Sequence, residues 1–342
     1  MRILVTGAAG YIGSVLTPKL LKQGHEVTAI DRFFFGDTLP DDKNLIKIKS
    51  DARNFDPKLL VNKDIVIDLV AISNDPAGEV YKDATYAINH KSRVKTATLA
   101  KKYGIQRYIL PSSCSIYGFQ DGNSIANEES KTNPLTHYAV SNEMAENDIL
   151  PLASKDFCVT IIRQATVYGY SPRMRFDLAI NGMSYGAWKD RLLPLMRDGN
   201  QWRPMIHVSD TSDAIIFMIS QPKELINREI FNAGSPENVY QLKPLAKRVA
   251  DVIGSDVKIK WYGEKDTRSY NVSFEKIQNL GFQAKFKVED GVSEILLKLE
   301  SGDLDKTKKT ITLDWYNEIT KWHKIIKDIE LNGKRKNRKR RN

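Results

Sequence analysis

Several features that would each point to a class of protein are missing from this 342-residue chain. There are only two cysteines, Cys114 and Cys158, and they lack the Cys-x-x-Cys spacing of a zinc or redox pair. No apolar run approaches the roughly 20 residues that a membrane span needs. The N-terminus lacks the order of basic segment, apolar core and cleavage site that marks a secretory signal. We therefore expect a soluble, cytoplasmic protein with no membrane span, disulfide framework or metal site.

Positive charge is present but concentrated at one end. The formal net charge is +10, and the last nine residues, KRKNRKRRN, carry seven of the cations, so the rest of the chain has about +3. A run of like charges cannot bury itself, which predicts a disordered, solvated tail over residues 331–342. Contact of this tail with RNA, acidic lipid or an acidic partner stays open as an alternative. The remaining charge does not indicate a nucleic-acid partner.

Over roughly the first 165 residues, short apolar runs alternate with longer amphipathic segments, as in a parallel sheet covered by helices on both faces. We expect helices in residues 11–24, 81–104 and 137–154. Buried strands are expected at residues 2–6, 25–30, 65–71, 107–113 and 158–163. This order predicts an α/β fold with a Rossmann-like, doubly wound parallel sheet.

The texture changes after Tyr168 to loops rich in Gly, Arg and Trp, followed by further amphipathic helices. We expect residues 1–168 to form a dinucleotide-binding domain, to which residues 204–235 return. Residues 169–203 and 236–330 are expected to form a smaller, partly interleaved C-terminal domain that binds substrate.

The segment TGAAGYIG follows the first expected strand at once and opens a helix. Gly7 can make the tight turn, Gly10 lets the backbone approach a diphosphate, and Gly13 allows close packing of the helix on the strand. The anion would lie at the helix N-terminus. Asp31, at the end of the second strand, would bind the adenosine ribose hydroxyls and repel a 2′-phosphate, which favours NAD over NADP. Arg32 beside it weakens that preference slightly.

With this loop, the SSCSIYG run and a tyrosine at 138, residues 1 to about 300 resemble an extended short-chain dehydrogenase/reductase of the NAD-dependent nucleotide-sugar epimerase/dehydratase family. Further matching segments are SDARN, DLVAIS, IRQATVYG and RPMIHVSD, in the family's order. Besides the glycines and Asp31, the resemblance implies cofactor contacts from Tyr11, Ile12, Arg32, Asp51, Ala52, Leu69, Ala71, Asn89, Tyr138 and Asn142.

The resemblance also implies a catalytic mechanism. Ionised Tyr138 would remove a proton from a sugar hydroxyl while the carbon gives hydride to NAD, and Ser113 would relay the hydrogen bond. Asn142 stands where family members carry a lysine that lowers the pKa of the tyrosine and binds the nicotinamide ribose. An unperturbed tyrosine titrates near 10. We therefore expect the cofactor site to be retained and the acid–base step to be slower, or to need a higher pH.

The two positions after Ser113 depart from those of family members that eliminate water, which carry Asp and Glu there. This chain has Cys114 and Ser115, and this disfavours 4,6-dehydration. A thiol could act as acid or base in an atypical dehydratase, and it could equally be a small apolar residue beneath the sugar. Ser115 is expected to contact the substrate.

Arginines mark the expected substrate end. Arg203 and Arg268 align with family positions that bind the diphosphate of a nucleotide-sugar, and Arg173 is expected near the same mouth. Each of them alone could be a solvated surface charge. Thr166 stands where many members turn an asparagine toward the nucleotide. The segment SPRMRFDL followed by WRPMIHV resembles a subgroup linked to bacterial surface-polysaccharide sugars.

Together these observations predict an NAD-dependent nucleotide-sugar epimerase or 4-oxidoreductase in surface-polysaccharide sugar biosynthesis. One alternative is an atypical dehydratase that uses Cys114. Another is a catalytically weak protein that binds NAD or a nucleotide-sugar, for which Asn142 is the supporting feature. The family also implies a homodimer formed through helices in residues 81–104 and 137–153.

Overall fold

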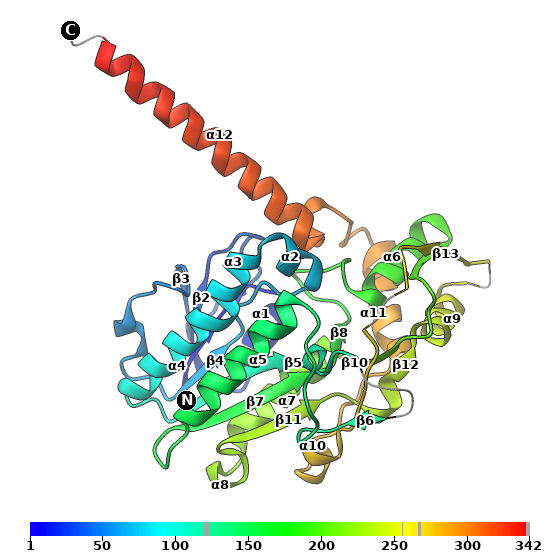
Figure 1. Cartoon of the computed structure of the whole chain (residues 1–342), viewed down its shortest axis with the longest axis horizontal. Helices are drawn as coiled ribbons and strands as arrows, with labels where there is room; N and C mark the ends of the chain where they lie inside the picture. Colours follow the sequence, from blue (N-terminus) through cyan, green and yellow to red (C-terminus); the bar gives the residue numbers. More distant parts are fainter. Residues whose placement is uncertain (120–123, 255, 266–267, 340–342) are drawn as a thin grey trace.

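The computed structural model describes residues 1–119, 124–254, 256–265 and 268–339 (Figure 1). Its centre is a seven-stranded sheet in the order β11-β7-β5-β4-β1-β2-β3, in which every neighbouring pair is parallel. The strands are β1 (Arg2–Thr6), β2 (Glu26–Asp31), β3 (Leu45–Lys49), β4 (Ile65–Asp68), β5 (Arg107–Ser113), β7 (Cys158–Gln164) and β11 (Glu229–Ala233). The predicted doubly wound α/β fold is confirmed.

Helices cover both faces of this sheet because its strands are apolar on both sides. Ile3 and Val5 of β1 face a core shared with α1 (Gly13–Lys22) and α7 (Val208–Ser220). Leu4, between them in sequence, faces the opposite core, shared with α4 (Arg93–Lys102) and α5 (His137–Ile149). This alternation is the period of two expected of a strand buried on both faces.

The position of the cavity follows from strand order. The chain builds β1, β2 and β3 in one direction and then crosses to β4, β5, β7 and β11 on the other side of β1. The carboxyl ends of β1 and β4 therefore flank the point at which the order reverses, where doubly wound sheets bind ligands. β11 and α7 come from residues 208–233, which return to this domain from the second one.

The segment expected as one helix over residues 81–104 is divided in three. It consists of α3 (Lys82–Thr85), a π-helical stretch from Tyr86 to Ser92, and α4. The short helix α2 (Asp75–Val80) precedes it and is capped by the Asn74 side chain, which accepts from the N–H of Ala77. A π-helical stretch is rare and is often found at functional sites.

The second domain is built from small sheets and helices. Its main core joins α6 (Ala179–Asp190), α9 (Leu242–Ile253) and α11 (Val288–Glu300). Two short helices, α8 (Lys223–Ile226) and α10 (Glu275–Asn279), pack instead against β11 of the central sheet. The paired strands are β8 (Thr166–Tyr168), β10 (Trp202–His207) and β12 (Val239–Gln241) in one sheet, β9 (Leu192–Met196) with β13 (Lys258–Tyr262), and β6 (Ile125–Ala126) with β14 (Asn271–Val272).

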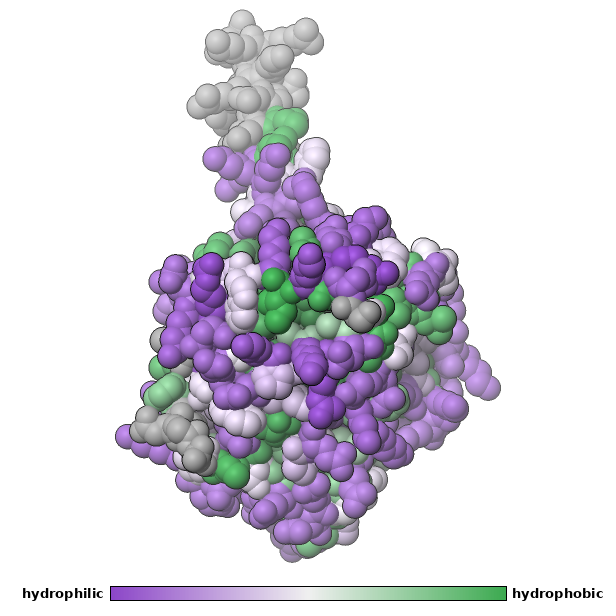
Figure 2. All heavy atoms as spheres, turned by 90° about the vertical axis from the view of Figure 1, so that its right-hand side faces the viewer, coloured by the Kyte–Doolittle hydropathy of each residue, from purple (hydrophilic) through white to green (hydrophobic). Residues whose placement is uncertain are grey.

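The C-terminal segment differs from the disordered tail expected over residues 331–342. Helix α12 (Thr312–Lys339) projects from the body as one rod, and residues 340–342 lie outside the described chain (Figure 1). Lysine and arginine are good helix formers, so the segment can extend a helix that is already nucleated against the body. Figure 2 shows this helix rising above a mainly hydrophilic surface on which hydrophobic residues gather near its base.

The described residues contain neither a candidate membrane span nor a candidate metal site. None of the helices in this part of the chain is long and apolar enough to cross a membrane. Within the same residues, no group of three or more His, Cys, Asp and Glu side chains is placed to hold a metal ion.

Candidate active site

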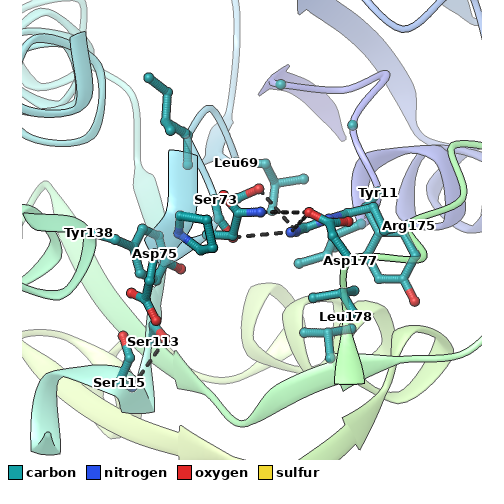
Figure 3. Close-up of a pocket in the computed structure, with 18 of the residues that line it drawn as sticks. Tyr11, Leu69, Ser73, Asp75, Ser113, Ser115, Tyr138, Arg175, Asp177 and Leu178 are labelled. Atoms are coloured by element: carbon teal, nitrogen blue, oxygen red, sulfur yellow. Dashed lines mark hydrogen bonds and ion pairs between the residues drawn. The ribbon is translucent and has the colours of Figure 1, made fainter. Parts of the chain in front are cut away.

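A cavity of about 1110 Å³ opens at the carboxyl edge of the central sheet. One part is lined by the β1–α1 loop and the ends of β2 and β4, and the other by residues of the second domain. Figure 3 shows Tyr138, Ser113 and Asp75 on one side of the pocket and Arg175 with Asp177 on the other. The cavity therefore spans both domains.

The glycine loop has the shape expected of a diphosphate cradle. Gly7 has φ +66°, and a Cβ there would lie 2.8 Å from the backbone of Leu69. A Cβ on Gly13 would lie 2.3 Å from the carbonyl oxygen of Ala8, so only glycine permits this helix start. Gly7, Gly10, Tyr11, Ile12 and Gly13 all line the cavity, and their contact with the cofactor stays a prediction.

Asp31 is held in place at the same end. Its carboxylate accepts from the N–H of Ala9 at 3.0 Å and from the N–H of Phe33 at 2.7 Å. Burial raises the pKa of Asp31, and these hydrogen bonds oppose the shift. An acceptor fixed beside a glycine loop fits the ribose hydroxyls of a dinucleotide. The residues present therefore fit NAD.

The adenine end contains a small charge cluster. Asp51 accepts from Arg32 at 2.7 Å and from Arg53 at 2.6 Å, and the Arg53 hydrogen bond is the main reason that its pKa falls to about 2. Arg32 and Asp51 line the cavity together with Ala52, Leu69 and Ala71. Because Arg32 is engaged with Asp51, its charge is partly balanced.

Tyr138 is in the first turn of α5 and lines the cavity beside Ser113 at the end of β5. Thr136 caps this helix by accepting from the N–H of Ala139 at 3.2 Å, and its hydroxyl donates to Asp75 at 2.7 Å. Burial raises the pKa of Tyr138. A hydrogen bond from Ser113 and the charges of Arg93 and Arg175 lower it, whereas Asp75 raises it. The structure thus brings the predicted base and relay together.

Asn142 does not line the cavity, in contrast to its expected contact with the cofactor. It is buried, and its Nδ2 donates to the Tyr138 carbonyl at 2.9 Å. Its Oδ1 accepts from Nη1 of Arg93 at 2.8 Å. Arg93 itself lines the cavity and was not identified from the sequence. The one available signal was its place four residues after Asn89, on the same side of the helix.

Asn89 is also outside the cavity lining but supports it. Its side chain pairs with both backbone groups of Ile72, accepting from N–H at 2.8 Å and donating to the carbonyl at 3.0 Å. Nδ2 also donates to Ser141 at 3.2 Å. This buried amide fixes the segment after β4, which forms the floor of the cavity, against α5.

The structure does not bring Cys114 together with Tyr138. Cys114 is fully buried, its thiol donates to the carbonyl of Arg163 at 3.2 Å, and it is not among the described residues that line the cavity. Burial raises the pKa of the thiol, so it stays protonated. This placement contradicts the proposed use of Cys114 as acid or base.

The far part of the cavity is lined by Arg203, Arg268, Ser115 and Thr166, whose contact with substrate stays a prediction. The Arg203 guanidinium lies over the ring of Tyr270 at 5.1 Å, and Arg268 pairs with Asp75. Among the described residues the Ser115 hydroxyl oxygen is buried without a hydrogen-bond partner. A buried polar atom in this state calls for a ligand or a water molecule.

Arg173 lies elsewhere than expected. Its guanidinium is 3.7 Å from the ring centre of Phe35 and donates to Thr312 at 3.0 Å, near Asp31 and Tyr316. Burial lowers its pKa to about 10. Arg173 therefore belongs to the cofactor end, where Tyr316 of α12 also lines the cavity. Sequence analysis missed α12 there because the helix comes from the far end of the chain.

Comparisons with known proteins agree with this geometry. The chain is 29% identical over 322 residues to an uncharacterized UDP-glucose epimerase, YtcB, of Bacillus subtilis (strain 168), covering 88% of this chain and 98% of that protein. It is 28% identical to a UDP-N-acetyl-alpha-D-glucosaminuronate decarboxylase of Bacillus cytotoxicus, covering 82% and 86%. The structure of MoeE5 in complex with UDP-glucuronic acid and NAD is similar with a TM-score of 0.78 at 26% identity, covering 88% and 100%.

The family itself is shown by a match over most of the chain. Residues 3–234 match the model of the NAD dependent epimerase/dehydratase family. This match includes the glycine loop, Asp31, Ser113 and Tyr138. The chain therefore belongs to the NAD-dependent epimerase/dehydratase family, and NAD is its cofactor.

Proposed function

We propose that this protein is a nucleotide-sugar epimerase or 4-oxidoreductase. The observation that carries the proposal is the place of Tyr138 and Ser113. They lie in one cavity between the glycine loop and a second end that contains Arg203 and Arg268. A guanidinium fork suits the paired oxygens of a diphosphate. A sugar between a bound diphosphate and the nicotinamide would then lie against Tyr138.

The chain's own residues supply the acid–base part of the reaction. NAD, when bound, accepts a hydride from a sugar carbon. Oη of Tyr138, once ionised, takes the proton of the hydroxyl on that carbon, which leaves a ketone on the sugar. Ser113 holds the tyrosine oxygen and can donate to the sugar oxygen. In the reverse direction Tyr138 would give the proton back to the ketone oxygen as the carbon regains its hydride, which restores a sugar of the same mass, as an epimerase requires.

The cavity offers little for elimination of water. Cys114 is outside it, and Ser115 provides a hydroxyl instead of a carboxylate. The carboxylate of Asp75 also lines the cavity, but it forms an ion pair with Arg268 and accepts a hydrogen bond from Thr136. Reaction at one carbon asks only for Tyr138 and Ser113.

The test is incubation of the purified protein with a panel of nucleotide-sugars, including GDP-heptoses and UDP-uronic acids, in deuterated solvent. We expect a product of the same sugar mass with changed configuration, or an oxidised or reduced sugar. Tyr138→Phe should lower turnover by about 10²- to 10⁴-fold with NAD binding retained. Tyr103→Phe, at an exposed tyrosine after α4, is the matched control.

Binding of a nucleotide-sugar with no reaction at any pH would instead favour the alternative function, a catalytically weak protein that binds NAD or a nucleotide-sugar. A role in surface-polysaccharide biosynthesis and a homodimer formed through residues 81–104 and 137–153 are part of the same proposal. Light scattering of the full chain tests the dimer.

A further inference from the structure

We propose that Arg93 supplies the positive charge that activates Tyr138, and that Asn142 serves to hold this arginine in place. The inference rests on the proposed function, because it assigns a positioning residue to the same reaction. It concerns a residue on a different helix from the tyrosine.

A tyrosine base in this cavity needs a cation. Its ordinary pKa is near 10, and burial raises it further. The charged groups that face Tyr138 are Asp75 from α2, Arg175 from the loop after β8, and Arg93 from the start of α4. Two of these are balanced locally, since Asp75 pairs with Arg268 and Arg175 pairs with Asp177 at 2.9 Å.

Arg93 is different because its partners are neutral. Nε donates to the carbonyl of Val70 at 3.0 Å and Nη1 donates to Asn142. Among the described residues no carboxylate forms an ion pair with it, although the side chain is only 3% exposed. The buried Asp68 accepts hydrogen bonds from the hydroxyls of Thr6 and Tyr108, at 2.5 Å each, and among the described residues it forms no direct ion pair with Arg93. A buried cation that no carboxylate contacts directly is costly, which points to a functional role.

The local structure holds this charge at the wall of the cavity that Tyr138 also lines. The π-helical stretch ends at Ser92, so Arg93 opens α4 beside α5. Asn142 is one turn after Tyr138 and bridges the Arg93 guanidinium to the Tyr138 carbonyl. Arg93 also lines the cavity. In a partly dry site, a cation within about 4–6 Å favours an ionised neighbour by 1–3 pKa units.

Position 142 then has a defined task. Asparagine offers an acceptor to the guanidinium and a donor to the backbone without adding charge. A lysine there would place a second cation against Arg93 in a buried site. We therefore expect Asn142→Lys alone to destabilise the protein and to bring no large gain in turnover near neutral pH.

The experiment is a cycle of Arg93→Gln, Asn142→Lys and the double variant, with Arg93→Lys as the conservative control. Turnover is measured against pH, and the titration of Tyr138 is followed by NMR of ¹³C-tyrosine in the NAD-loaded protein, with Tyr138→Phe to assign its signal. Arg93→Gln should lower turnover near neutral pH by about 10- to 100-fold, and the loss should shrink in alkali. In Arg93→Lys and in the double variant, the titration midpoint of Tyr138 should stay close to that of the wild type.

An unchanged Tyr138 midpoint in folded Arg93→Gln would overturn the inference. If Arg93→Gln does not fold, the titration midpoint of Tyr138 in the double variant tests the inference instead. Should Arg93 contribute nothing, the new lysine would move the midpoint well below that of the wild type. The NMR arm also separates this inference from the proposed function. A midpoint raised in Arg93→Gln with no turnover in any form would uphold Arg93 and reject the enzyme.

Discussion

The two ends of the cavity are built in different ways. At the cofactor end, Gly7, Gly10 and Gly13 come from one loop, and Asp31 ends the next strand. At the substrate end, Arg203 and Arg268 come from segments 65 residues apart and meet near Asp75. The glycine loop and Asp31 are close together in sequence, whereas the substrate end forms only when distant segments of the chain have come together.

This difference implies that the two ends can be damaged separately. The glycine loop of the cofactor end depends on its backbone conformation, so substitutions in it should affect both folding and NAD binding. The substrate end depends on charged side chains, so substitution of these side chains should leave NAD binding intact. The predictions below test this separation, in order of decreasing effect.

The largest effect is expected from Gly13→Ala. The new Cβ would lie 2.3 Å from the Ala8 carbonyl oxygen, and backbone cannot move aside easily. We expect the free energy of unfolding to fall by about 1–3 kcal/mol, with a large loss of NAD affinity. Gly10→Ala, whose Cβ would meet only the Gly7 carbonyl at 3.0 Å, is the matched comparison. It should weaken NAD binding with a smaller change in stability. Equal stability losses in the two variants, measured by denaturant unfolding, would contradict this account.

Arg268→Gln tests the other end. It removes a charge that can bind a diphosphate and that pairs with Asp75. Isothermal titration should show about 10- to 100-fold weaker binding of the nucleotide-sugar and unchanged binding of NAD. Arg248→Gln, at an arginine whose partner Glu289 is on the surface, serves as the control. A parallel loss of NAD affinity in Arg268→Gln would show that the two ends are not separate.

Helix α12 provides a sharper test within the cofactor end. Trp315 donates to the carbonyl of Phe34 at 2.6 Å, and Phe34 lines the cavity. Trp315→Ala should weaken NAD binding by about 3- to 10-fold, since it removes that hydrogen bond and its packing. Trp322, seven residues further along, is 54% exposed, and among the described residues its indole N–H donates to Glu318 of the same helix and to no other group. Trp322→Ala should bind NAD as the wild type does. A loss of NAD affinity as large as that of Trp315→Ala would refute a specific role for the first turns of α12.

The smallest effect concerns Asp51. Its pKa is lowered from 3.8 to about 2, so its folded-state stabilisation is present above 3.8 and is lost as pH falls toward 2. Asp51→Asn should therefore cost about 1 kcal/mol or less near neutral pH, and nothing at the acid end of that window. Urea unfolding across this pH range measures it. A difference from the wild type that persists at the lowest pH would mean that packing, and not charge, is responsible.

Much of the cofactor end could be predicted because the residues that identify it lie close together along the chain. The glycine spacing, the strand before it and Asp31 lie within about thirty residues. Strand β3 escaped prediction because it is a half-buried edge strand with the sequence LIKIK, in which lysines interrupt the apolar run. The buried strands β1, β4, β5 and β7 carried a much stronger signal.

The parts that were missed depend on tertiary structure. Arg93 is one of several cations in a lysine-rich helix, and nothing in sequence shows that it faces Asn142. Arg173 was expected among the substrate arginines, whereas packing on Phe35 and Thr312 draws it to the cofactor end. Cys114 follows Ser113 directly but turns into the core, since the 3₁₀ turn over Cys114–Tyr117 directs the two side chains differently.

The most direct test of the account is rapid mixing of NAD-loaded protein with the nucleotide-sugar that the panel selects, followed by the absorbance of reduced nicotinamide across pH. The account predicts a transient rise in the wild type that grows with pH as Tyr138 ionises, and no rise in Tyr138→Phe. An equal rise in Tyr138→Phe, or none in the wild type at any pH although the sugar binds, would contradict it.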